Sequence, residues 1–527
     1  MSVQLTLYDG ARSIGGNKFL LEAEDAVLLL DFGLNFGALG AFYDEFLGPR
    51  PTTGLLDPLE LGLLPPLEGI YRPDFQLSDG RPWERLRRRA GYRRLDHLDG
   101  VLITHAHVDH TGQLSYLRED VPVYTGVTTA VVAKVMQDTS PAGAERETCY
   151  VVPREEREGL LHTGNFRQVP SRGRPFVALD PVPDAAAAFW QASPATRALE
   201  AASLRASPDG ARVGGLVVRR FPVDHSIPGS CAFAVGTPAG WVVYTGDLRL
   251  HGTRGGQTRA FMEEARKLSP LALICEGTHP DQHSPVTEAQ VAERAGATVR
   301  SARGLVVADF GPRNVERLLA FRQAAREADR LLAVTTRDAY LLEALHAAGE
   351  PGVGDPLEDA HLALYVKTRA QRLGWERALL DRYAERCPER VVGPREVGAA
   401  PQRFVLCFSY YDLPELIDVA PPGGTYIYSS SEAFNEEMHL DLDRLRHWLR
   451  HLGLAFAGEP PRRDGTGGDP GFHASGHIHG PGLVELVETI DPQLLIPVHT
   501  ERPEFFRQHF PHRRVLFPRI GEPVRLA

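Results

Sequence analysis

A short stretch of the sequence, ITHAHVDHTGQL (Ile103 to Leu114), carries three histidines and an aspartate within the six positions 105–110. Imidazole and carboxylate groups together suit Zn²⁺, and also Mn²⁺ or Fe²⁺. Side chains two residues apart in an extended segment point to the same side, so His105 and His107 can face one metal. Asp109 and His110, on the turn into the next helix, can serve a second metal. A lone histidine after a strand is more often a packed residue, but this spacing predicts a metal site.

This motif alone holds too few ligands for two ions, so further ligands must come from elsewhere in the chain. Four other candidates follow apolar runs that read as strands, and they are Asp31, His225, Asp247 and His499. Each one taken singly is an ordinary loop residue. Together, and in this order after the first motif, they indicate that several strand ends supply one metal centre.

The elements that must position these residues are short apolar strands in the first part of the chain. Strands this apolar indicate sheets covered on at least one face. The predicted strands are 3–8, 18–22, 26–31, 100–105, 215–223, 231–235, 241–247 and 271–277. The Pro- and Gly-rich segment 38–96 fits no regular element and is expected to form part of a rim.

From about Thr287 the pattern changes to alternating helices and strands, which predicts a parallel sheet with helices on its faces. We expect helices over 287–302 and 436–452, and others beginning near Asn314 and Asp338. Residues 458–471 read as a loop. A helix, strand, helix pattern then returns up to the end of the chain.

Length and composition limit the alternatives. With 527 residues, of which 43% are hydrophobic, the chain can build more than one core. The five cysteines are scattered and form no CxxC pair, which argues against a disulfide framework and against a thiolate zinc site. A net charge of −10 does not mark a polyanion binder, but a local basic groove on an acidic protein remains compatible with one. The densest basic stretch, RLRRRAGYRR (85–94), reads equally as a solvated helix face or as a phosphate track.

The N-terminus has neither the basic region nor the apolar region of a signal peptide. No apolar run is long enough to span a bilayer. We therefore expect a cytoplasmic protein that does not insert into membranes.

The order of these motifs resembles the metallo-β-lactamase fold, an αββα sandwich with the metals at one edge. The resemblance implies roles for each matching residue. His105, His107 and His225 match ligands of one metal, Asp109 and His110 match ligands of the other, and Asp247 matches the bridging carboxylate. Asp31 matches an aspartate that usually does not bind the metal itself but holds the ligands in place. We expect two divalent ions, with Zn²⁺ as the first choice and Mn²⁺ as the alternative. The fold alone hosts many chemistries.

Three later motifs resemble the β-CASP branch, whose members process nucleic acids and carry an inserted α/β domain. These are Glu276 in LICEGTH, His477 in HASGHIHG and His499 in IPVHTE. A histidine at the third motif, ligating the second metal, is typical of the RNA-acting members. The chain is most similar to bacterial ribonuclease J. The resemblance implies residues 1–283 and 471–527 as the metallo-β-lactamase domain, with 284–470 as the β-CASP insert.

Some features depart from that family. The segments YSSSEAFNEE (428–437) and ADFGPRNVERL (308–318) match its phosphate-handling segments only in part. The family normally has a further C-terminal domain that helps to build oligomers, whereas this chain ends at Ala527, so a homodimer is left open. Within and beside HASGH, we predict that His473, Ser475 and His479 contact the substrate.

The predicted activity is hydrolysis of RNA phosphodiester bonds, as an endonuclease, a 5′ exonuclease or both, on single strands. Two cations bridged by Asp247 can lower the pKa of a water held between them to about 7. Asp109 takes part through the metal, and His477, oriented by Glu276, is the expected proton donor to the leaving oxygen. The alternatives are a DNA-processing nuclease of the same branch, a small-molecule metallohydrolase, and a non-catalytic subunit of a processing complex.

Overall fold

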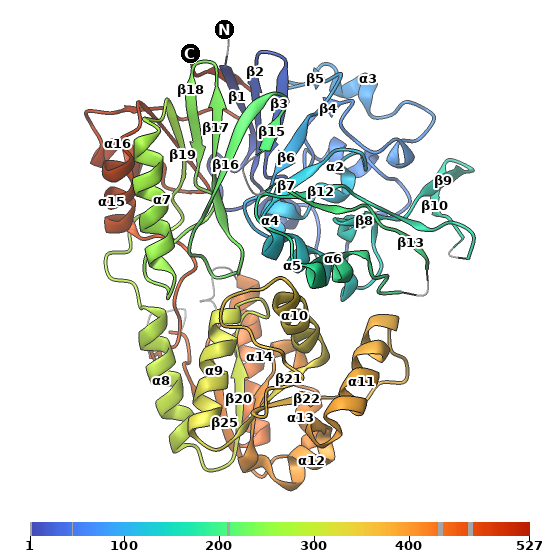
Figure 1. Cartoon of the computed structure of the whole chain (residues 1–527), viewed down its shortest axis with the longest axis vertical. Coiled ribbons are helices and arrows are strands. Elements are labelled where there is room, and N and C mark those ends of the chain that lie inside the picture. Colours follow the sequence, from blue (N-terminus) through green and yellow to red (C-terminus); the bar gives the residue numbers. More distant parts are fainter. Residues whose placement is uncertain are drawn as a thin grey trace.

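A computed structural model describes residues 3–44, 46–165, 167–195, 197–207, 211–430, 436–461 and 467–527. The described chain builds three large sheets. Two of them belong to the upper part of the molecule in Figure 1, which also holds both termini, and the third lies in the lower part.

The first sheet mixes parallel and antiparallel strands. Its parallel half carries the 105–110 motif, because β6 lies beside β3, and its antiparallel half is the meander β3, β2, β1. Across the sheet the order is β14 (Leu204–Ala206), β12 (Phe176–Ala178), β7 (Val123–Thr125), β6 (Gly100–Leu102), β3 (Ala26–Leu30), β2 (Lys18–Ala23), β1 (Val3–Asp9) and β29 (Pro523–Arg525).

The second sheet is antiparallel at one end and parallel at the other. Strands β18, β19 and β27 are parallel neighbours. Strands β19 and β27 are far apart in sequence, because the whole third sheet lies between them in the chain. The order is β15 (Ala211–Val213), β16 (Leu216–Pro222), β17 (Cys231–Thr237), β18 (Gly240–Tyr244), β19 (Ala272–Glu276), β27 (Leu494–Val498) and β28 (Arg514–Val515).

The two sheets share a core of alternate side chains from their facing strands. Leu5, Phe19 and Leu28 of the first sheet pack with Phe233 and Ile496 of the second, and all five are fully buried. The outer face of the second sheet is covered by α7 (Gly255–Lys267), α15 (Gly480–Ile490) and α16 (Glu504–His509). The outer face of the first sheet is covered by α5 (Val127–Asp138) and its neighbours. The predicted αββα sandwich is therefore confirmed.

The third sheet is parallel throughout, as the alternation of helices and strands predicts. Its order is β23 (Val391–Val392), β22 (Leu362–Tyr365), β21 (Leu331–Thr335), β24 (Phe404–Cys407), β20 (Leu305–Asp309), β25 (Gly424–Tyr428) and β26 (Leu454–Ala457). Its helices are α8 (Glu288–Ser301), α9 (Val315–Glu327), α10 (Thr336–Ala347), α11 (Gly374–Arg386), α12 (Pro394–Ala399), α13 (Glu415–Val419) and α14 (Glu436–Leu452). The fold is thus a metallo-β-lactamase sandwich with an inserted α/β domain, and the boundaries at 283/284 and 470/471 stay a prediction.

The predicted helices follow local signals that the structure bears out. Thr287 is the N-cap of α8 and forms a capping box with Gln290. Asn314 caps α9, and α14 has the predicted bounds. The helix expected from Asp338 begins two residues earlier, because Thr335 caps it and Asp338 completes the capping box.

The segment 38–96 is more than a rim. It contains the short helices α1 (Phe36–Gly40), α2 (Leu56–Glu60) and α3 (Trp83–Leu86) and the paired strands β4 (Leu67–Glu68) and β5 (Arg93–Arg94). Its apolar side chains, including Leu59, Tyr71 and Trp83, join the core outside the first sheet. These elements are too short to produce a recognisable period in the sequence.

The insert and the sandwich are joined by polar contacts as well as by a shared core. Helices α5 and α10 pack together, and the Tyr340 hydroxyl donates to Asp138 at 2.9 Å. The Thr128 hydroxyl donates to Glu350 at 2.9 Å. Among the helices described, none has the length and apolar character needed to cross a bilayer.

Candidate metal centre and active site

The candidate ligands meet at one edge of the sandwich, where the carboxyl ends of parallel strands lie together. Each follows or ends a strand: Asp31 follows β3, His105 and His107 follow β6, Asp247 follows β18, Glu276 ends β19 and His499 follows β27. The two strands that lead to these ligands in the first sheet end sooner than predicted, β3 at Leu30 and β6 at Leu102, whereas β1 and β2 run one residue further than predicted. The ligands therefore stand on the turns beyond the sheet.

Asp109 and His110 lie on a one-turn helix, α4 (Val108–Thr111), that is fixed against the end of β3. The backbone N–H of Phe32 donates to the His110 carbonyl at 2.9 Å, and that of Leu34 donates to Val108 at 3.0 Å. Between them, a β-carbon on Gly33 would lie 1.6 Å from the Asp109 carbonyl oxygen. Only glycine allows this approach, and it holds the helix against the strand.

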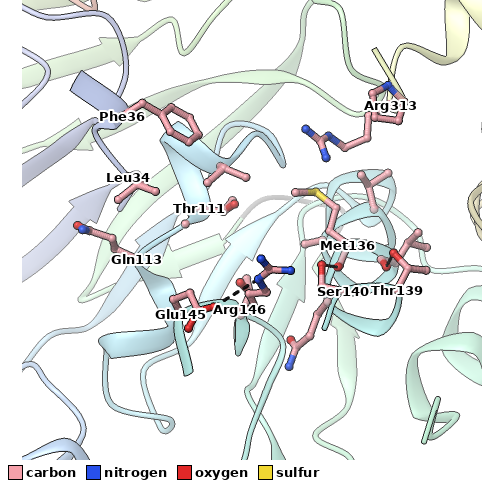
Figure 2. A pocket seen from close by; sticks show the side chains of 18 of the residues that line it. Leu34, Phe36, Thr111, Gln113, Met136, Thr139, Ser140, Glu145, Arg146 and Arg313 are labelled. Carbon is pink, nitrogen blue, oxygen red and sulfur yellow. Dashed lines mark hydrogen bonds and ion pairs between the residues drawn. The ribbon is translucent and has the colours of Figure 1, made fainter. Parts of the chain in front are cut away.

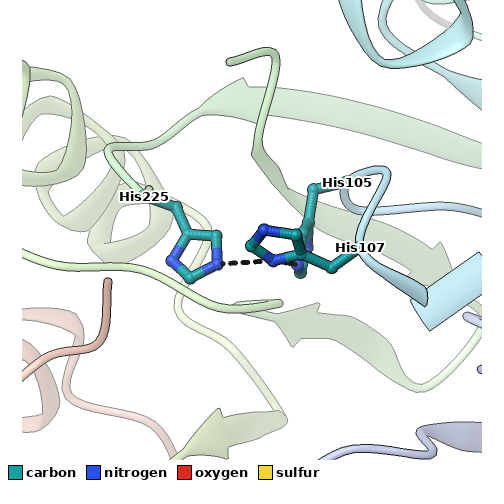
Figure 3. Close-up of side chains that lie close together, drawn as sticks. All are labelled: His105, His107 and His225. Carbon is teal, nitrogen blue, oxygen red and sulfur yellow. Dashed lines mark hydrogen bonds between the residues drawn. The ribbon is translucent and has the colours of Figure 1, made fainter. Parts of the chain in front are cut away.

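The first ligand group consists of three imidazole rings that face one another (Figure 3). Nε2 of His105 and Nε2 of His225 each lie 3.1 Å from Nδ1 of His107. Nitrogens bound to one tetrahedral zinc at about 2.0–2.1 Å lie about 3.3–3.4 Å apart, so the three rings already have nearly the required spacing.

Hydrogen bonds behind these rings assign their tautomers. The Thr104 hydroxyl donates to Asp31 at 2.9 Å and therefore accepts from Nδ1 of His105 at 3.1 Å. The carbonyl of Gly476 accepts from Nδ1 of His225. Both rings consequently turn an unprotonated Nε2 toward the third ring, which is the usual arrangement of metal-binding histidines.

The second ligand group shares a carboxylate with the first. Oδ2 of Asp247 lies 3.1 Å from Nε2 of His110 and 3.6 Å from Nε2 of His499. The same oxygen lies 3.8 Å from Nε2 of His105 and 3.9 Å from Nε2 of His225. Asp247 thus faces both groups, as a bridging ligand must.

Asp109 and Asp31 complete the second group from opposite sides. Oδ2 of Asp109 lies 3.3 Å from Nε2 of His499. Asp31 is fully buried and accepts from Nδ1 of His110 and from the Tyr244 hydroxyl, both at 2.7 Å. Asp31 therefore orients His110 without facing the metal position itself.

These residues fit two divalent cations. Burial lowers the pKa of His107 to about 3 and the pKa values of His105 and His225 well below their usual value, so the three rings are neutral ligands. Facing lone pairs repel one another unless a cation lies between them. Oδ1 of Asp247 is buried and has no hydrogen-bond partner in the described chain, and a cation would satisfy it.

Beside the second group, His477 is held by Glu276 and Thr278. Nδ1 of His477 donates to Oε2 of Glu276 at 3.0 Å, and the Leu248 N–H donates to Oε1 of Glu276 at 2.6 Å. Burial alone lowers the pKa of His477, but the charges of Glu276 and Asp247 outweigh it and raise the pKa to about 9. The orientation of the ring is thus fixed by a buried carboxylate.

A cavity of about 820 Å³ opens in front of the centre, between the sandwich and the insert. His107 and His477 lie on its wall, together with Ser475 and His473. Ser475 accepts the backbone N–H of His477 at 3.1 Å. Both ring nitrogens of His473 lie against backbone carbonyls, one of them Gly458 at 3.1 Å. The two residues are placed where a substrate could reach them, and their contact with substrate stays a prediction.

His479 is placed differently. It caps α15, with Nδ1 accepting the Gly482 N–H at 2.9 Å, and it is absent from the described lining of the cavity. Its substrate contact also stays a prediction. Of the segment predicted to handle phosphate, 428–437, residues 431–435 lie outside the described residues.

Two threonines of the centre are missed by sequence reasoning. Thr104 fixes His105, and the Thr278 hydroxyl donates to Glu276 at 2.8 Å and accepts from Nδ1 of His499 at 2.9 Å. Threonine is common at strand ends, so only its neighbours in ITHAH and EGTH could have indicated these roles.

Comparison with known proteins agrees with this geometry. Residues 79–180 match the family described as the beta-lactamase superfamily domain. Ribonuclease J of Sinorhizobium meliloti is 26% identical over 299 residues, which cover 56% of this chain and 47% of that protein. Ribonuclease J of Helicobacter pylori is 19% identical over 343 residues, 64% of this chain and 37% of that protein. The transcription termination factor FttA of Pyrococcus abyssi is 29% identical over 129 residues, 23% of this chain and 14% of that protein.

The chain therefore spans less than half the length of each of these relatives. Among solved structures, a protein of unknown function from Enterococcus faecalis V583 superposes with a TM-score of 0.64 at 20% identity, with all of both chains covered, and this likeness shows the fold. The chain carries a beta-lactamase superfamily domain in a metallo-β-lactamase fold, and it is related to the ribonuclease J and FttA proteins, as its β-CASP motifs predict.

Proposed function

We propose that this chain is a metal-dependent ribonuclease that hydrolyses phosphodiester bonds of single-stranded RNA. One observation carries the proposal: Asp247 faces two groups of candidate ligands, and His477, held by Glu276, lies with the candidate ligand His107 on the wall of the adjacent cavity. A generic metallohydrolase needs ligand groups that face a common carboxylate. It does not need an oriented acid such as His477, which comes from the segment that follows the inserted domain in the chain.

The ligand sets are His105, His107 and His225 for one cation, and Asp109, His110 and His499 for the other, with Asp247 shared. Bound Zn²⁺ or Mn²⁺ would lower the pKa of water and neutralise charge on the phosphoryl oxygens. Zn²⁺ suits the histidine-rich first set best. Asp31, Thr104 and Thr278 keep the ligand rings in the required orientation.

His477 is the proton donor to the leaving 3′ oxygen in this proposal. Its Nδ1 is engaged by Glu276, which leaves Nε2 for the substrate in the cavity. Glu276 positions the ring and favours its charged form. The cavity lies between two domains, so the strand must enter it unpaired to bring a backbone phosphate to the centre.

RNA is favoured over DNA by His499 at the third β-CASP motif and by the names of the ribonuclease J relatives. A DNA nuclease of the same branch is the alternative. Cleavage within the strand, cleavage from the 5′ end, or both, stays a prediction. A homodimeric state and a cytoplasmic location also stay predictions.

The test is cleavage of matched single strands. RNA with a 5′ monophosphate, triphosphate or hydroxyl and DNA of the same sequence are incubated with protein reconstituted with Zn²⁺ or Mn²⁺, and product lengths are mapped. We expect RNA to be cut faster with at least one metal. Equal or faster cleavage of DNA with both metals would favour the alternative, and no cleavage of either would refute the proposal.

A further inference from the structure

A second cavity, of about 480 Å³, adjoins the cavity of the metal centre (Figure 2). The two meet at a narrow boundary. On one side, Leu34 and Phe36 face the second cavity while Asn35 and Gly37 face the first. On the other side, Arg313 borders both.

Arg313 differs from most arginines of the described chain in having no side-chain partner there. It lies on the loop between β20 and α9, and its side chain makes no hydrogen bond or ion pair with the described residues; its Nε is buried without a partner. Burial lowers the pKa of its guanidinium, and the charge of Asp109 opposes this shift. Most other buried arginines here are fully engaged, as Arg249 is with three carboxylates. A guanidinium N–H that is buried without an acceptor is costly, and an anion that binds there would remove this cost.

The walls of the second cavity are mainly apolar. Leu34 and Phe36 line one side and Met136 another, and Figure 2 shows the Phe36 ring and the Arg313 guanidinium directed into the space between them. Phe36 is 58% exposed, which is unusual for a phenylalanine with no partner to cover it. The volume lies in the range of about 300–1,000 Å³ that small ligands occupy.

Three of the hydroxyl groups that line this cavity are already used. Thr111, Thr139 and Ser140 donate to the backbone carbonyls of His107, Val135 and Met136. They have no proton left with which to read the edge of a base. The mainly apolar walls can hold a flat ring by contact. Oε1 of Gln113, which also lines the cavity, is buried without a hydrogen-bond partner in the described residues and can accept a hydrogen bond from that ring.

We propose that this second cavity receives one nucleobase of the RNA strand next to the scissile phosphate, and that Arg313 binds a phosphate of the same nucleotide. This inference rests on the proposed function. An aromatic ring beside a guanidinium that has no partner among the described residues, next to the proposed phosphodiester-cleaving centre, matches a nucleotide in both charge and shape. The arrangement would hold the strand in register while its backbone crosses the metal position.

The experiment measures binding without catalysis. Full-length protein is treated with EDTA, its far-UV circular dichroism is checked against untreated protein, and its affinity for a fluorescein-labelled 12-nucleotide RNA is measured by anisotropy. Each position of the RNA is replaced in turn by an abasic residue. We expect one abasic position to weaken binding about 5- to 100-fold, because stacking of one base is typically worth that much.

Phe36→Ala should weaken binding of intact RNA to the same degree, and it should add little further loss on the RNA that is abasic at that one position. Additive losses, or no sensitive position, would overturn the base-binding role.

Arg313→Gln should lower the slope of log affinity against log salt by about 0.7, the value for one phosphate on a single strand. Arg266→Gln, an equal charge change on the exposed face of α7, is the matched control and should leave the slope unchanged. If wild-type protein cleaves RNA while Phe36→Ala and Arg313→Gln bind like wild type, the inference fails and the proposed function stands. If RNA binding depends on Phe36 and Arg313 but the wild-type protein cleaves no RNA, the proposed function fails and this inference stands.

Discussion

Arg249 is the residue whose loss should most disturb the junction between the ligand loops and the insert. Its guanidinium is fully buried and bonds to Asp224 at 3.0 Å, to Glu288 at 2.9 Å and to Glu316 at 2.6 Å. It also donates to the Ser475 carbonyl at 3.1 Å. Asp224 precedes the candidate ligand His225, whereas Glu288 and Glu316 lie in the first turns of α8 and α9 in the insert. The Arg249 guanidinium therefore joins the loop that carries His225 to the insert.

The expected cost of Arg249→Met follows from these contacts. Methionine fills much of the volume but leaves the carboxylates without their shared cation. Removing one partner of a buried ion pair costs about 3–5 kcal/mol of unfolding free energy. Arg259→Met, which removes an exposed pair with Glu485 at 3.1 Å, should cost less than about 1 kcal/mol.

The assay is urea unfolding followed by fluorescence, with comparison limited to variants of equal m-value. The double variant Arg249→Met with Asp224→Asn tests the cause, because neutralising one orphaned carboxylate should recover part of the loss. We expect a coupling free energy of about 0.5–3 kcal/mol. A loss no larger than that of Arg259→Met, or strict additivity in the double variant, would refute the reasoning.

Three further outcomes are expected. His477→Ala should keep its metal content and lose about 10²- to 10⁴-fold in single-turnover RNA cleavage, with recovery on RNA that has sulfur at the leaving position; loss of metal or absence of recovery would make His477 a ligand or a substrate clamp. Asp109→Asn with His110→Ala should bind fewer equivalents of metal by elemental analysis, and unchanged content would show the ligand assignment to be wrong. Burial raises the pKa of Asp309, whose carboxylate accepts from Tyr426 at 2.6 Å, to about 7. Between the ordinary aspartate pKa of about 4 and the folded-state pKa of about 7, the folded state holds a proton that the unfolded state has released. The free energy of unfolding therefore falls as the pH rises through this window, and the fall is complete just above pH 7. Calorimetry should show the unfolding free energy of wild type, relative to Asp309→Asn, falling by about 2 to 3 kcal/mol from pH 5 to pH 8, and a constant difference would contradict this.

The sequence by itself determined the features that depend on neighbours in the chain. The spacing of His105, His107, Asp109 and His110 is local, and so is the capping of α8 by Thr287. The strands are recognisable because residues buried on both faces form continuous apolar runs. The parallel insert follows from the order of such elements, whereas the αββα class came from the resemblance of the ligand motifs to the metallo-β-lactamase family.

Only the tertiary structure decided which distant residues meet. Glu276 and His477 are 201 residues apart, and their hydrogen bond exists because β19 pairs with β27 across the whole insert. The support of the ligand rings by Thr104 and Thr278 depends on hydrogen-bond directions that no periodicity encodes. That Nε of Arg313 is buried without a partner in the described part of the chain depends on its surroundings, since the sequence supplies many arginines and carboxylates but does not say which of them pack together. Residue types and spacing are fixed by the chain locally, whereas burial and pairing are set by contacts between elements far apart in sequence.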